Sequence, residues 1–429
     1  MSELVREIQA AELPELLNSK KPVVVDFFST ECPPCEALAP KYEAVAQLFH
    51  DDVEFVKIFR QGNRDLANEL GVKGSPTVLF FKDGHEIGHR LTSAIHRSQL
   101  LEELKAIEPE ERFDAIVNSA ERTETDADVL ILGAGPAGTT AAIYCAQARL
   151  KTVMVDIGLG GGNVAVTHQV SNFPGFPKPM PGYLLADHMV EQAKAAGVIP
   201  RLAAEVTKID LERHEVVLDG VETIRAKRLV IATGSSPRVI GVKGEREFKG
   251  KGVSYCATCD AKYYEGKHVV VIGGGNSAIE ESLFIARFAS KITIVNQFPT
   301  LQANQHAQDQ ARAEPKIEFR LSTQPREFLA RNGKTVDGVL VEDLATGEKQ
   351  VIDCDGVFVF AGMVPNLELL EGKFKLDGWG YIAVDDEMHS SVPGVFAIGD
   401  VASKKFRQIT TAVSDGTIAS MSLAKELAT

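Results

Sequence analysis

The first quarter of the chain alternates short apolar runs with segments in which apolar residues recur at helical spacing. The short runs predict buried strands, at 22–28 (PVVVDFF), 53–59 (VEFVKIF) and 75–84 (SPTVLFFKDG). Helical spacing marks 35–49 and 98–107. We therefore expect residues 1–107 to form one unit of alternating strands and helices.

A charged segment follows this unit. Residues 108–127 (EPEERFDAIVNSAERTETDA) contain few residues suited to a core, so they are predicted to be a linker with one helical stretch around 112–120.

The pattern changes at residue 128 and then repeats. Residues 128–148 (DVLILGAGPAGTTAAIYCAQA) predict a strand, a glycine-rich turn and a helix, and residues 268–289 have the same order. Two such units indicate two dinucleotide-binding domains in an α/β chain.

The first glycine-rich turn contains Gly133, Gly135 and Gly138. Their expected roles are a tight turn, close approach of the backbone to a pyrophosphate, and close packing of helix on strand. The helix that follows offers N–H donors to phosphates. Asp156 ends the next strand, where a carboxylate accepts hydrogen bonds from ribose hydroxyls. The alternative is a glycine-rich turn that binds no ligand.

The second turn contains Gly273, Gly275 and Ala278, and alanine at the third position still allows close packing. The strand after it ends in residues 296–302 (NQFPTLQ), which include no Arg, Lys or carboxylate. Gln297 can bond a 2′-hydroxyl but cannot neutralise a 2′-phosphate. We therefore expect NADH rather than NADPH, with loss of nicotinamide binding as the alternative.

Near the C-terminus, residues 394–402 (GVFAIGDVA) predict a short strand that ends at Gly399 and Asp400. A carboxylate at a strand end suits the polyol chain of a cofactor, although Gly-Asp is also an ordinary turn sequence.

Composition narrows the class of protein. The 429 residues are 44% apolar and carry a net charge of −13, which disfavours nucleic acid and anionic lipid as partners. The first residues lack the pattern of a secretory signal, and no run is long and apolar enough to span a membrane. We expect a cytoplasmic protein of two or three domains.

Six cysteines add candidate chemistry. Cys256 and Cys259 form a C-x-x-C pair, which suits a redox disulfide or half of a zinc site. Nearby residues offer no second pair of zinc ligands, so we expect no metal. Asp260 follows directly and is either the acid or base of the redox step or a surface residue ending a turn. Cys145 and Cys354 are expected to be buried small hydrophobic residues.

Cys32 and Cys35 form a second pair, between a predicted strand and a predicted helix. The helix N-terminus lowers the pKa of the first thiol, and the second thiol resolves a mixed disulfide. Asp26, inside an apolar run, is either a proton acceptor for the pair or a hydrogen-bonded structural residue. Pro76 begins a strand beside the pair and is a candidate for a cis peptide bond.

Residues 1–107 resemble thioredoxin, on the evidence of Asp26, the C-x-x-C pair, Pro40 and Pro76. Two positions depart from that family: Glu31 replaces its tryptophan, and Pro33-Pro34 replaces Gly-Pro. The resemblance implies a thioredoxin fold that acts on protein disulfides.

Residues 126–429 resemble the low-molecular-weight thioredoxin reductases and the reductase part of the alkyl hydroperoxide reductase flavoprotein. The matching motifs are GAGPAG (Gly133 to Gly138, with Pro136 and Ala137), GGN (with Gly162 and Asn163), ATG (Ala232, Thr233, Gly234), CATCD, GGGNSA (with Asn276, Ser277 and Ala278), AIGD and Gln408. The resemblance implies FAD in the first glycine unit, Asp400 on its ribityl chain and Gln408 near its ring. It also implies that Asp260 is the acid beside the redox pair.

The resemblance further implies a thioredoxin domain followed by two Rossmann-like three-layer domains. We expect a thioredoxin domain at 1–107, a linker at 108–127, an FAD-binding domain at 128–240 and 363–429, and a nicotinamide-binding domain at 241–362. A homodimer is expected. Electrons would pass from the nicotinamide and FAD to Cys256–Cys259, then to Cys32–Cys35 and to protein disulfides. The alternatives are a flavoprotein that feeds a peroxiredoxin and a nicotinamide-independent protein, either ferredoxin-linked or carrying two flavins.

Overall fold

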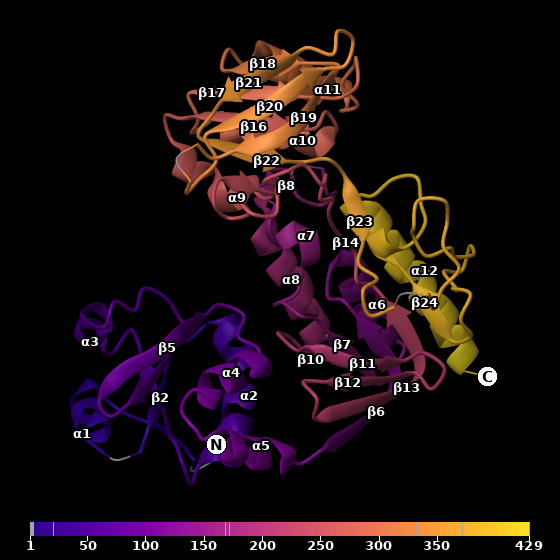
Figure 1. Cartoon of the computed structure of the whole chain (residues 1–429). Coiled ribbons are helices and arrows are strands. Elements are labelled where there is room, and N and C mark those ends of the chain that lie inside the picture. The colour runs from indigo at the N-terminus through magenta and orange to yellow at the C-terminus, as the bar shows by residue number, and fades with distance from the viewer. Residues whose placement is uncertain are drawn as a thin grey trace.

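The computed structural model describes residues 4–19, 21–167, 169–170, 172–331, 333–370 and 372–428. Three lobes, each built on its own main sheet, make up the chain (Figure 1). The expected fold class, a thioredoxin fold followed by two Rossmann-like units, is confirmed.

The N-terminal lobe is a five-stranded sheet in the order β1-β3-β2-β4-β5. Its strands are β1 (Val5–Glu7), β2 (Val23–Phe28), β3 (Glu54–Phe59), β4 (Thr77–Lys82) and β5 (His85–Thr92). The central strand β2 pairs in parallel with β3 and antiparallel with β4, so its apolar run is buried on both faces. The helical segments are η1 (Ala10–Glu12), α1 (Leu13–Leu17), α2 (Pro33–Phe49), α3 (Arg64–Glu69) and α4 (Arg97–Lys105).

The segment predicted as a linker is partly regular structure. Helix α5 (Glu110–Asn118) packs on the first lobe, with the Phe113 and Phe49 ring centres 5.8 Å apart. Strand β6 (Thr123–Leu132) then enters the second lobe. Residues 119–122 alone join α5 to β6.

The second lobe is a seven-stranded sheet, with the path β10-β7-β6-β13-β12-β11 and with β24 beside β13. Its strands are β6, β7 (Thr152–Val155), β10 (Ile199–Arg201), β11 (Val206–Asp210), β12 (Glu215–Leu218), β13 (Glu222–Ile231) and β24 (Val395–Ala397). The helical segments are α6 (Pro136–Gln147), α7 (Gly162–Ala165), α8 (Gly182–Ala195), η3 (Gly399–Val401) and α12 (Ile409–Leu427), and a small hairpin pairs β8 (Gln169–Val170) with β9 (Met180–Pro181). The carboxyl ends of the parallel strands β6, β7, β13 and β24 meet at one edge, where a ligand site is expected.

The third lobe has three layers. A parallel sheet in the order β15-β22-β16-β17-β18 lies between helices and a three-stranded antiparallel sheet. The parallel strands are β15 (Val253–Ser254), β16 (His268–Ile272), β17 (Lys291–Val295), β18 (Ile317–Arg320) and β22 (Gly356–Val359). The antiparallel strands are β19 (Thr323–Leu329), β20 (Gly338–Asp343) and β21 (Lys349–Asp353), and the helical segments are α9 (Ala257–Asp260), η2 (Ala261–Tyr264), α10 (Asn276–Ile285) and α11 (Gln305–Ala313).

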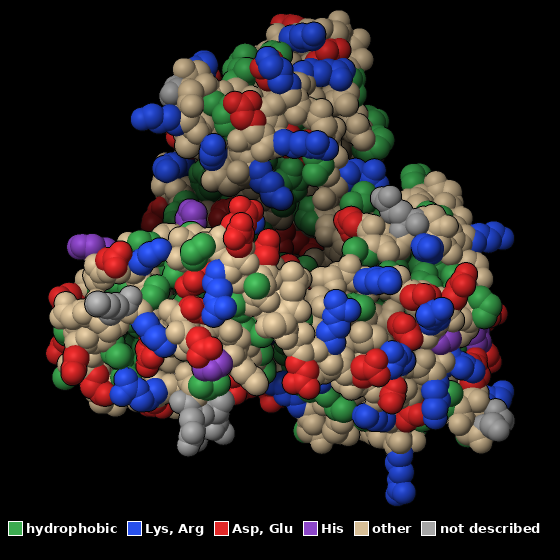
Figure 2. Space-filling model, turned by 60° about the horizontal axis from the view of Figure 1, so that its bottom comes forward, with side chains coloured by type: hydrophobic (Ala, Val, Ile, Leu, Met, Phe, Trp, Pro, Cys, Tyr) green, Lys and Arg blue, Asp and Glu red, His purple; other side chains and the backbone are tan. Residues whose placement is uncertain are grey.

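Two chain crossings join the second and third lobes. They form a two-stranded ribbon of β14 (Ser235–Pro237) and β23 (Met363–Pro365). The surface is hollowed where the third lobe meets the other two, and acidic and basic side chains are interspersed over the face in Figure 2. Among the described residues, no helix is long and apolar enough to cross a bilayer.

Candidate functional site

The first glycine-rich turn has the backbone that its sequence predicts. Gly133 has a φ of 112°, and a Cβ there would collide with the Ala232 carbonyl oxygen. A Cβ on Gly138 would collide with the Gly133 carbonyl oxygen, so α6 packs against the turn because residue 138 has no side chain. Gly135 precedes the first turn of α6, and its side-chain direction is open, the nearest atom being 3.8 Å away. This open helix start fits a pyrophosphate.

Asp156 holds this turn from the end of β7. One carboxylate oxygen accepts the Ala134 N–H and the other accepts the Gly158 N–H, both at 2.7 Å. Each oxygen has a further lone pair, and Asp156 lines the cavity, so the expected bond to a ribose remains a prediction.

The second glycine-rich turn has the same backbone features as the first, but the loop after the next strand is folded against it. Gly273 has a φ of 133°, and Gly275 has open space in its side-chain direction. Asn296 is buried, donates to the carbonyl oxygens of Phe298 (3.2 Å) and Thr300 (2.9 Å), and lies over Gly274. The amide of Asn296 thus folds residues 297–302 back against the turn and leaves Gln297 exposed at the surface.

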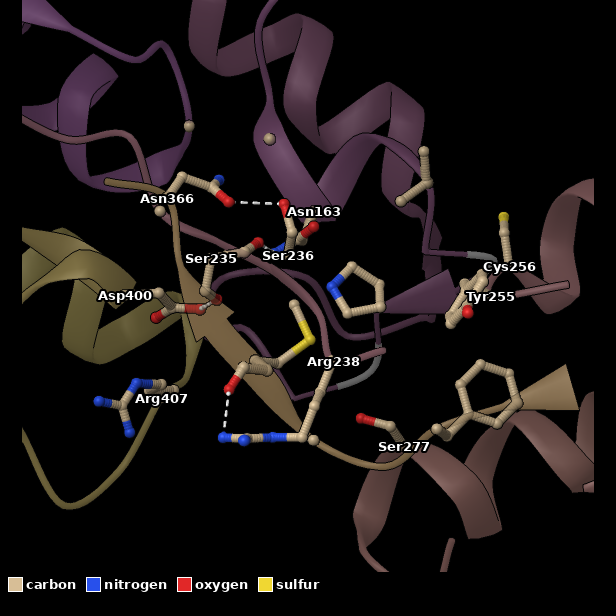
Figure 3. Close-up of a pocket in the computed structure, with 18 of the residues that line it drawn as sticks. Asn163, Ser235, Ser236, Arg238, Tyr255, Cys256, Ser277, Asn366, Asp400 and Arg407 are labelled. Atoms are coloured by element: carbon tan, nitrogen blue, oxygen red, sulfur yellow. Dashed lines mark hydrogen bonds between the residues drawn. The ribbon is translucent and has the colours of Figure 1, made fainter. Parts of the chain in front are cut away.

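A continuous cavity of about 1620 Å³ is lined by residues of the second and third lobes. Drug-sized ligand sites are commonly about 300–1,000 Å³, so this cavity is larger than the usual site for one drug-sized ligand. Among the described residues that line it, the cations are Arg238 and Arg407, and neither belongs to the loop 297–302. Figure 3 places Asp400 and Arg407 at one end and Tyr255 and Cys256 at the other.

Asp400 lies at the second-lobe end of the cavity. Its carboxylate accepts a 3.5 Å bond from the Ser235 hydroxyl, and burial raises its pKa, against the opposing charges of Lys404 and Arg407. The Arg407 guanidinium lies 3.6 Å from the centre of the Tyr381 ring, and its Nε is buried without a hydrogen-bond partner in the described part of the chain. Both groups are therefore available to a ligand.

Most of the predicted cofactor residues line this cavity: Gly133, Gly135, Pro136, Ala137, Asp156, Gly162, Asn163, Ala232, Thr233, Gly234, Gly273, Gly275, Asn276, Ser277, Gln297, Gly399, Asp400 and Gln408. Gly138 and Ala278 lie behind it, where helix packs on strand. Their contribution is therefore to the shape of the turns rather than to direct contact.

The Cys256–Cys259 disulfide lies at the start of α9. Cys256 precedes the helix, and its sulfur accepts the Cys259 N–H at 3.2 Å. Cys256 lines the cavity, whereas Cys259 is exposed. Asp260 ends the same short helix and lies outside the lining of the cavity.

A buried carboxylate supports this redox helix. Glu245 is fully buried and accepts hydrogen bonds from the backbone N–H groups of Ile240 (3.0 Å) and Gly241 (2.6 Å). It also accepts the Tyr255 hydroxyl at 2.7 Å. Glu245 therefore fastens the segment entering the third lobe to the residue before Cys256.

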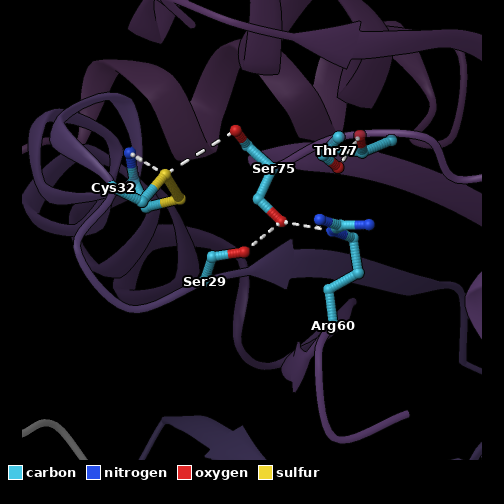
Figure 4. Close-up of a disulfide and its surroundings, with 7 residues drawn as sticks. Ser29, Cys32, Arg60, Ser75 and Thr77 are labelled. Carbon is cyan, nitrogen blue, oxygen red and sulfur yellow. Dashed lines mark hydrogen bonds between the residues drawn. A yellow bond between two sulfur atoms is a disulfide. The ribbon is translucent and has the colours of Figure 1, made fainter. Parts of the chain in front are cut away.

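The Cys32–Cys35 disulfide lies at the start of the longer helix α2. The Cys32 sulfur accepts the Cys35 N–H at 3.3 Å and lies 3.6 Å from the Ser75 carbonyl oxygen (Figure 4). The Ser75–Pro76 bond is cis. The Ser75 hydroxyl accepts hydrogen bonds from Ser29 (2.8 Å) and from Arg60 Nε (3.1 Å).

Asp26 lies on β2, the strand that precedes the turn carrying this disulfide, and is 6% exposed. Burial raises its pKa from 3.8 to about 7, and the charge of Lys57 opposes that rise. Its Oδ1 is buried without a hydrogen-bond partner among the described residues. A carboxyl group that titrates near neutral pH can either give or take a proton.

The other two cysteines are buried thiols, as expected. Burial raises the pKa values of Cys145 and Cys354 to about 12, so neither forms a thiolate near neutral pH.

Sequence reasoning missed Glu245, Arg238 and Arg407. Arg407 directly precedes Gln408, and that position was the available signal. Glu245 stands in a polar stretch that gives no indication of burial, and Arg238 directly follows the short strand β14.

Two family profiles match the chain. The profile of the pyridine nucleotide-disulphide oxidoreductases matches residues 127–416, and that of thioredoxin matches residues 5–106.

Curated relatives and solved structures agree with these profiles. A thioredoxin reductase of Bacillus subtilis is 42% identical over 69% of this chain and 93% of its own length. The "34.2 kDa protein in rubredoxin operon" of Clostridium pasteurianum is 40% identical over 70% of this chain and 97% of its own length. Two crystal structures of thioredoxin reductases match, one from Lactococcus lactis (35% identical) and one from T. acidophilum (36% identical), each with a TM-score of 0.67. The matches cover 99% of each of those chains, and 70% and 71% of this chain, respectively.

The shared region is the two-lobed unit with both glycine-rich turns and Cys256–Cys259, so the chain belongs to the pyridine nucleotide-disulphide oxidoreductases, is similar to their thioredoxin reductases, and carries a thioredoxin domain ahead of that unit.

Proposed function

We propose that the chain is a flavin-dependent disulfide reductase that takes electrons from NADH in preference to NADPH. It delivers them through Cys256–Cys259 to Cys32–Cys35 and then to protein disulfides. One observation carries the proposal: a single cavity is lined by both glycine-rich turns and by Cys256.

The second lobe suits FAD. Gly135 and the start of α6 would hold the pyrophosphate, Asp156 the ribose, and Asp400 the ribityl chain, while Arg407 and Gln408 lie at the same end of the cavity. When bound, FAD supplies a two-electron acceptor that can pass its electrons to a disulfide.

The sulfur chemistry then needs only residues of this chain. A thiolate of the reduced 256/259 pair attacks the Cys32 sulfur, which breaks the Cys32–Cys35 bond and leaves a Cys35 thiolate. Asp26 gives that thiolate a proton. The second thiol of the 256/259 pair then resolves the mixed disulfide, so two electrons reach Cys32 and Cys35. Asp260 exchanges the proton at the 256/259 pair.

The preference for NADH rests on the loop 297–302. A 2′-phosphate needs cationic partners in a partly buried site, and Gln297, Phe298 and Gln302 line this part of the cavity without one. The amide oxygen of Gln297 can still accept a hydrogen bond from a ribose hydroxyl of NADH.

Anaerobic titration tests the donor directly. NADH is expected to bleach the flavin absorbance at a lower concentration than NADPH. Equal or better bleaching by NADPH would contradict the preference.

The same neutral loop supports a second candidate, a nicotinamide-independent reductase linked to ferredoxin or carrying a second flavin. Absence of bleaching by either nucleotide, with rapid bleaching by reduced ferredoxin, would favour it. Peroxide turnover only after a peroxiredoxin is added would instead favour a peroxidase-feeding role.

We also retain three proposals about organisation. The nicotinamide-binding domain spans 241–362, the FAD-binding domain comprises 128–240 and 363–429, and the protein works as a homodimer. Rotation of residues 241–362 on the β14–β23 ribbon would carry Cys256–Cys259 from the flavin towards the thioredoxin domain.

A further inference from the structure

The thioredoxin domain and the FAD-binding lobe make direct polar contacts through residues outside the linker. Lys41 Nζ donates to the Leu202 carbonyl oxygen (2.9 Å), and His96 Nδ1 lies 3.1 Å from the Ala203 carbonyl oxygen. Arg97 Nη1 donates to the Asp219 carbonyl oxygen (3.3 Å). We call Lys41, His96 and Arg97 the docking face, and Leu202, Ala203 and Asp219 the dock.

Both cations of the docking face are covered. Lys41 is 9% exposed and Arg97 is 7% exposed, which is rare for these residues unless they are paired. Burial lowers the pKa of Lys41 to about 8, and the carboxylates of Asp219 and Glu205 oppose that shift. The lobe therefore offers negative charge where the thioredoxin domain buries positive charge.

The dock is preformed by the second lobe. Ala203 has a φ of 50°, which is uncommon for a residue other than glycine, and its N–H is bonded to the Gly158 carbonyl oxygen at 2.7 Å. Asp219 is bonded to the backbone of Glu205, through its N–H (2.8 Å) and its carboxylate (2.9 Å). These bonds fix the loop so that the carbonyl groups of Leu202 and Ala203 are available to Lys41 and His96.

The docking contacts leave several residues around the disulfide exposed. Lys41 lies two turns into α2, and Arg97 begins α4. Glu31, Pro33 and Gly74, which surround the disulfide in sequence and in the loop before Pro76, remain exposed. Docking thus leaves a route to Cys32.

We propose that the FAD-binding lobe docks the chain's own thioredoxin domain through these contacts, and that Cys32–Cys35 receives its electrons while docked. The moving part is then the lobe that carries Cys256–Cys259, and the linker does not set the local concentration of the thioredoxin disulfide. The second half of this proposal rests on the function proposed above.

The test compares the full-length, FAD-loaded protein with Lys41→Met/Arg97→Met and with the single variant Asp219→Asn. Asparagine keeps the bond to Glu205 and removes only the charge. Arg64→Met, an exposed cation on α3, is the matched control. Small-angle X-ray scattering reports domain release without any electron donor. Photoreduction with deazaflavin then drives insulin reduction without a nicotinamide.

The expected result is a larger radius of gyration for the docking variants and an insulin reduction rate lowered by about tenfold, as local concentration is lost. Arg64→Met should change neither. An unchanged radius of gyration in both docking variants would overturn the dock. A larger radius with an equal or higher rate would overturn the claim that the docked form accepts electrons. Failure of NADH alone, with photoreduction intact, would concern the proposed donor and not the dock.

Discussion

The two C-x-x-C disulfides have the same local geometry and different surroundings. In each, the first cysteine precedes a helix and its sulfur accepts the N–H of the second cysteine, at 3.3 Å for Cys32 and 3.2 Å for Cys256. Helix α2 has 17 residues and α9 has four. Both sulfurs of the first pair are in buried residues, whereas Cys259 is exposed. The spacing therefore gives both pairs the same local geometry, and they differ in the exposure of their second cysteine.

The acidic residues near the two cysteine pairs also differ in burial: the one near the first pair is the more buried. Asp26 is buried on β2 with a raised pKa, whereas Asp260 is half-buried at the end of α9. A buried acid can store a proton out of contact with water, but a half-exposed acid exchanges its proton with solvent. The following changes separate these roles, from the largest effect to the smallest.

Removing each pair should break the electron route at a different point. Cys256→Ser/Cys259→Ser is expected to lower donor-driven reduction of every disulfide by at least about a thousandfold. Cys32→Ser/Cys35→Ser should abolish insulin reduction but leave reduction of added free thioredoxin. Stopped-flow absorbance and insulin precipitation measure these rates. Full activity of the first double variant would refute the proposed order.

Asp26→Asn should stabilise the thioredoxin domain at pH 8. The folded-state pKa of Asp26, about 7, lies above its ordinary value of 3.8, so ionisation in the buried site costs stability. That cost is absent below about pH 4, grows between about pH 4 and pH 7, and levels off above pH 7 at about 4 kcal/mol, which corresponds to about 1.36 kcal/mol per pH unit.

Calorimetry of the full chain at pH 4 and pH 8 checks this sign. Asp260→Asn is the matched control and should change stability by less than about 0.5 kcal/mol. Equal stabilisation by Asp26→Asn at both pH values would show that ionisation of the buried carboxyl group does not lower the stability of the domain.

Exposure predicts the order in which the reduced thiols are alkylated. In the fully reduced protein, Cys259 should react with iodoacetamide at least about tenfold faster than Cys35, because Cys35 is 8% exposed. Timed alkylation followed by peptide mass spectrometry measures both rates. Equal rates would mean that the surroundings of the two pairs differ less than the oxidised structure indicates.

Arg60→Met should have the smallest effect. Arg60 reaches the active-site loop through Ser75, so its charge favours the Cys32 thiolate from a distance. Its removal should raise the pKa of the Cys32 thiol by less than about one unit, as read from thiolate absorbance at 240 nm. A decrease in that pKa would contradict the argument that the positive charge of Arg60 favours the Cys32 thiolate.

The sequence predicts this protein well where the chemistry is local. The apolar run of β2, Cys32 at the start of a helix and the glycine turns at 133–138 and 273–278 follow from neighbouring residues, and the structure contains each of them. The resemblance to two families then assigned the order of the domains.

Contacts between distant segments could not be predicted in this way. Lys41 meets Leu202 across 161 positions, and Asn296 folds its loop over a glycine 22 residues earlier. Neither residue type is usually buried, so no periodicity marks these positions. The extent of β6, which begins at Thr123 in a charged stretch, is likewise set by pairing with β13.

The carboxylate of Glu245 limits where the third lobe can bend. One buried side chain bonds both to the backbone of Ile240 and Gly241, which follow β14, and to Tyr255, so the segment that enters the third lobe is fastened to the residue before the redox helix. A swing of that lobe must therefore pivot on the chain before Ile240 and, on the return crossing, near β23. The cysteine pair would then move together with the segment from Ile240 to Tyr255, because the bonds of Glu245 hold the two ends of that segment at a fixed separation.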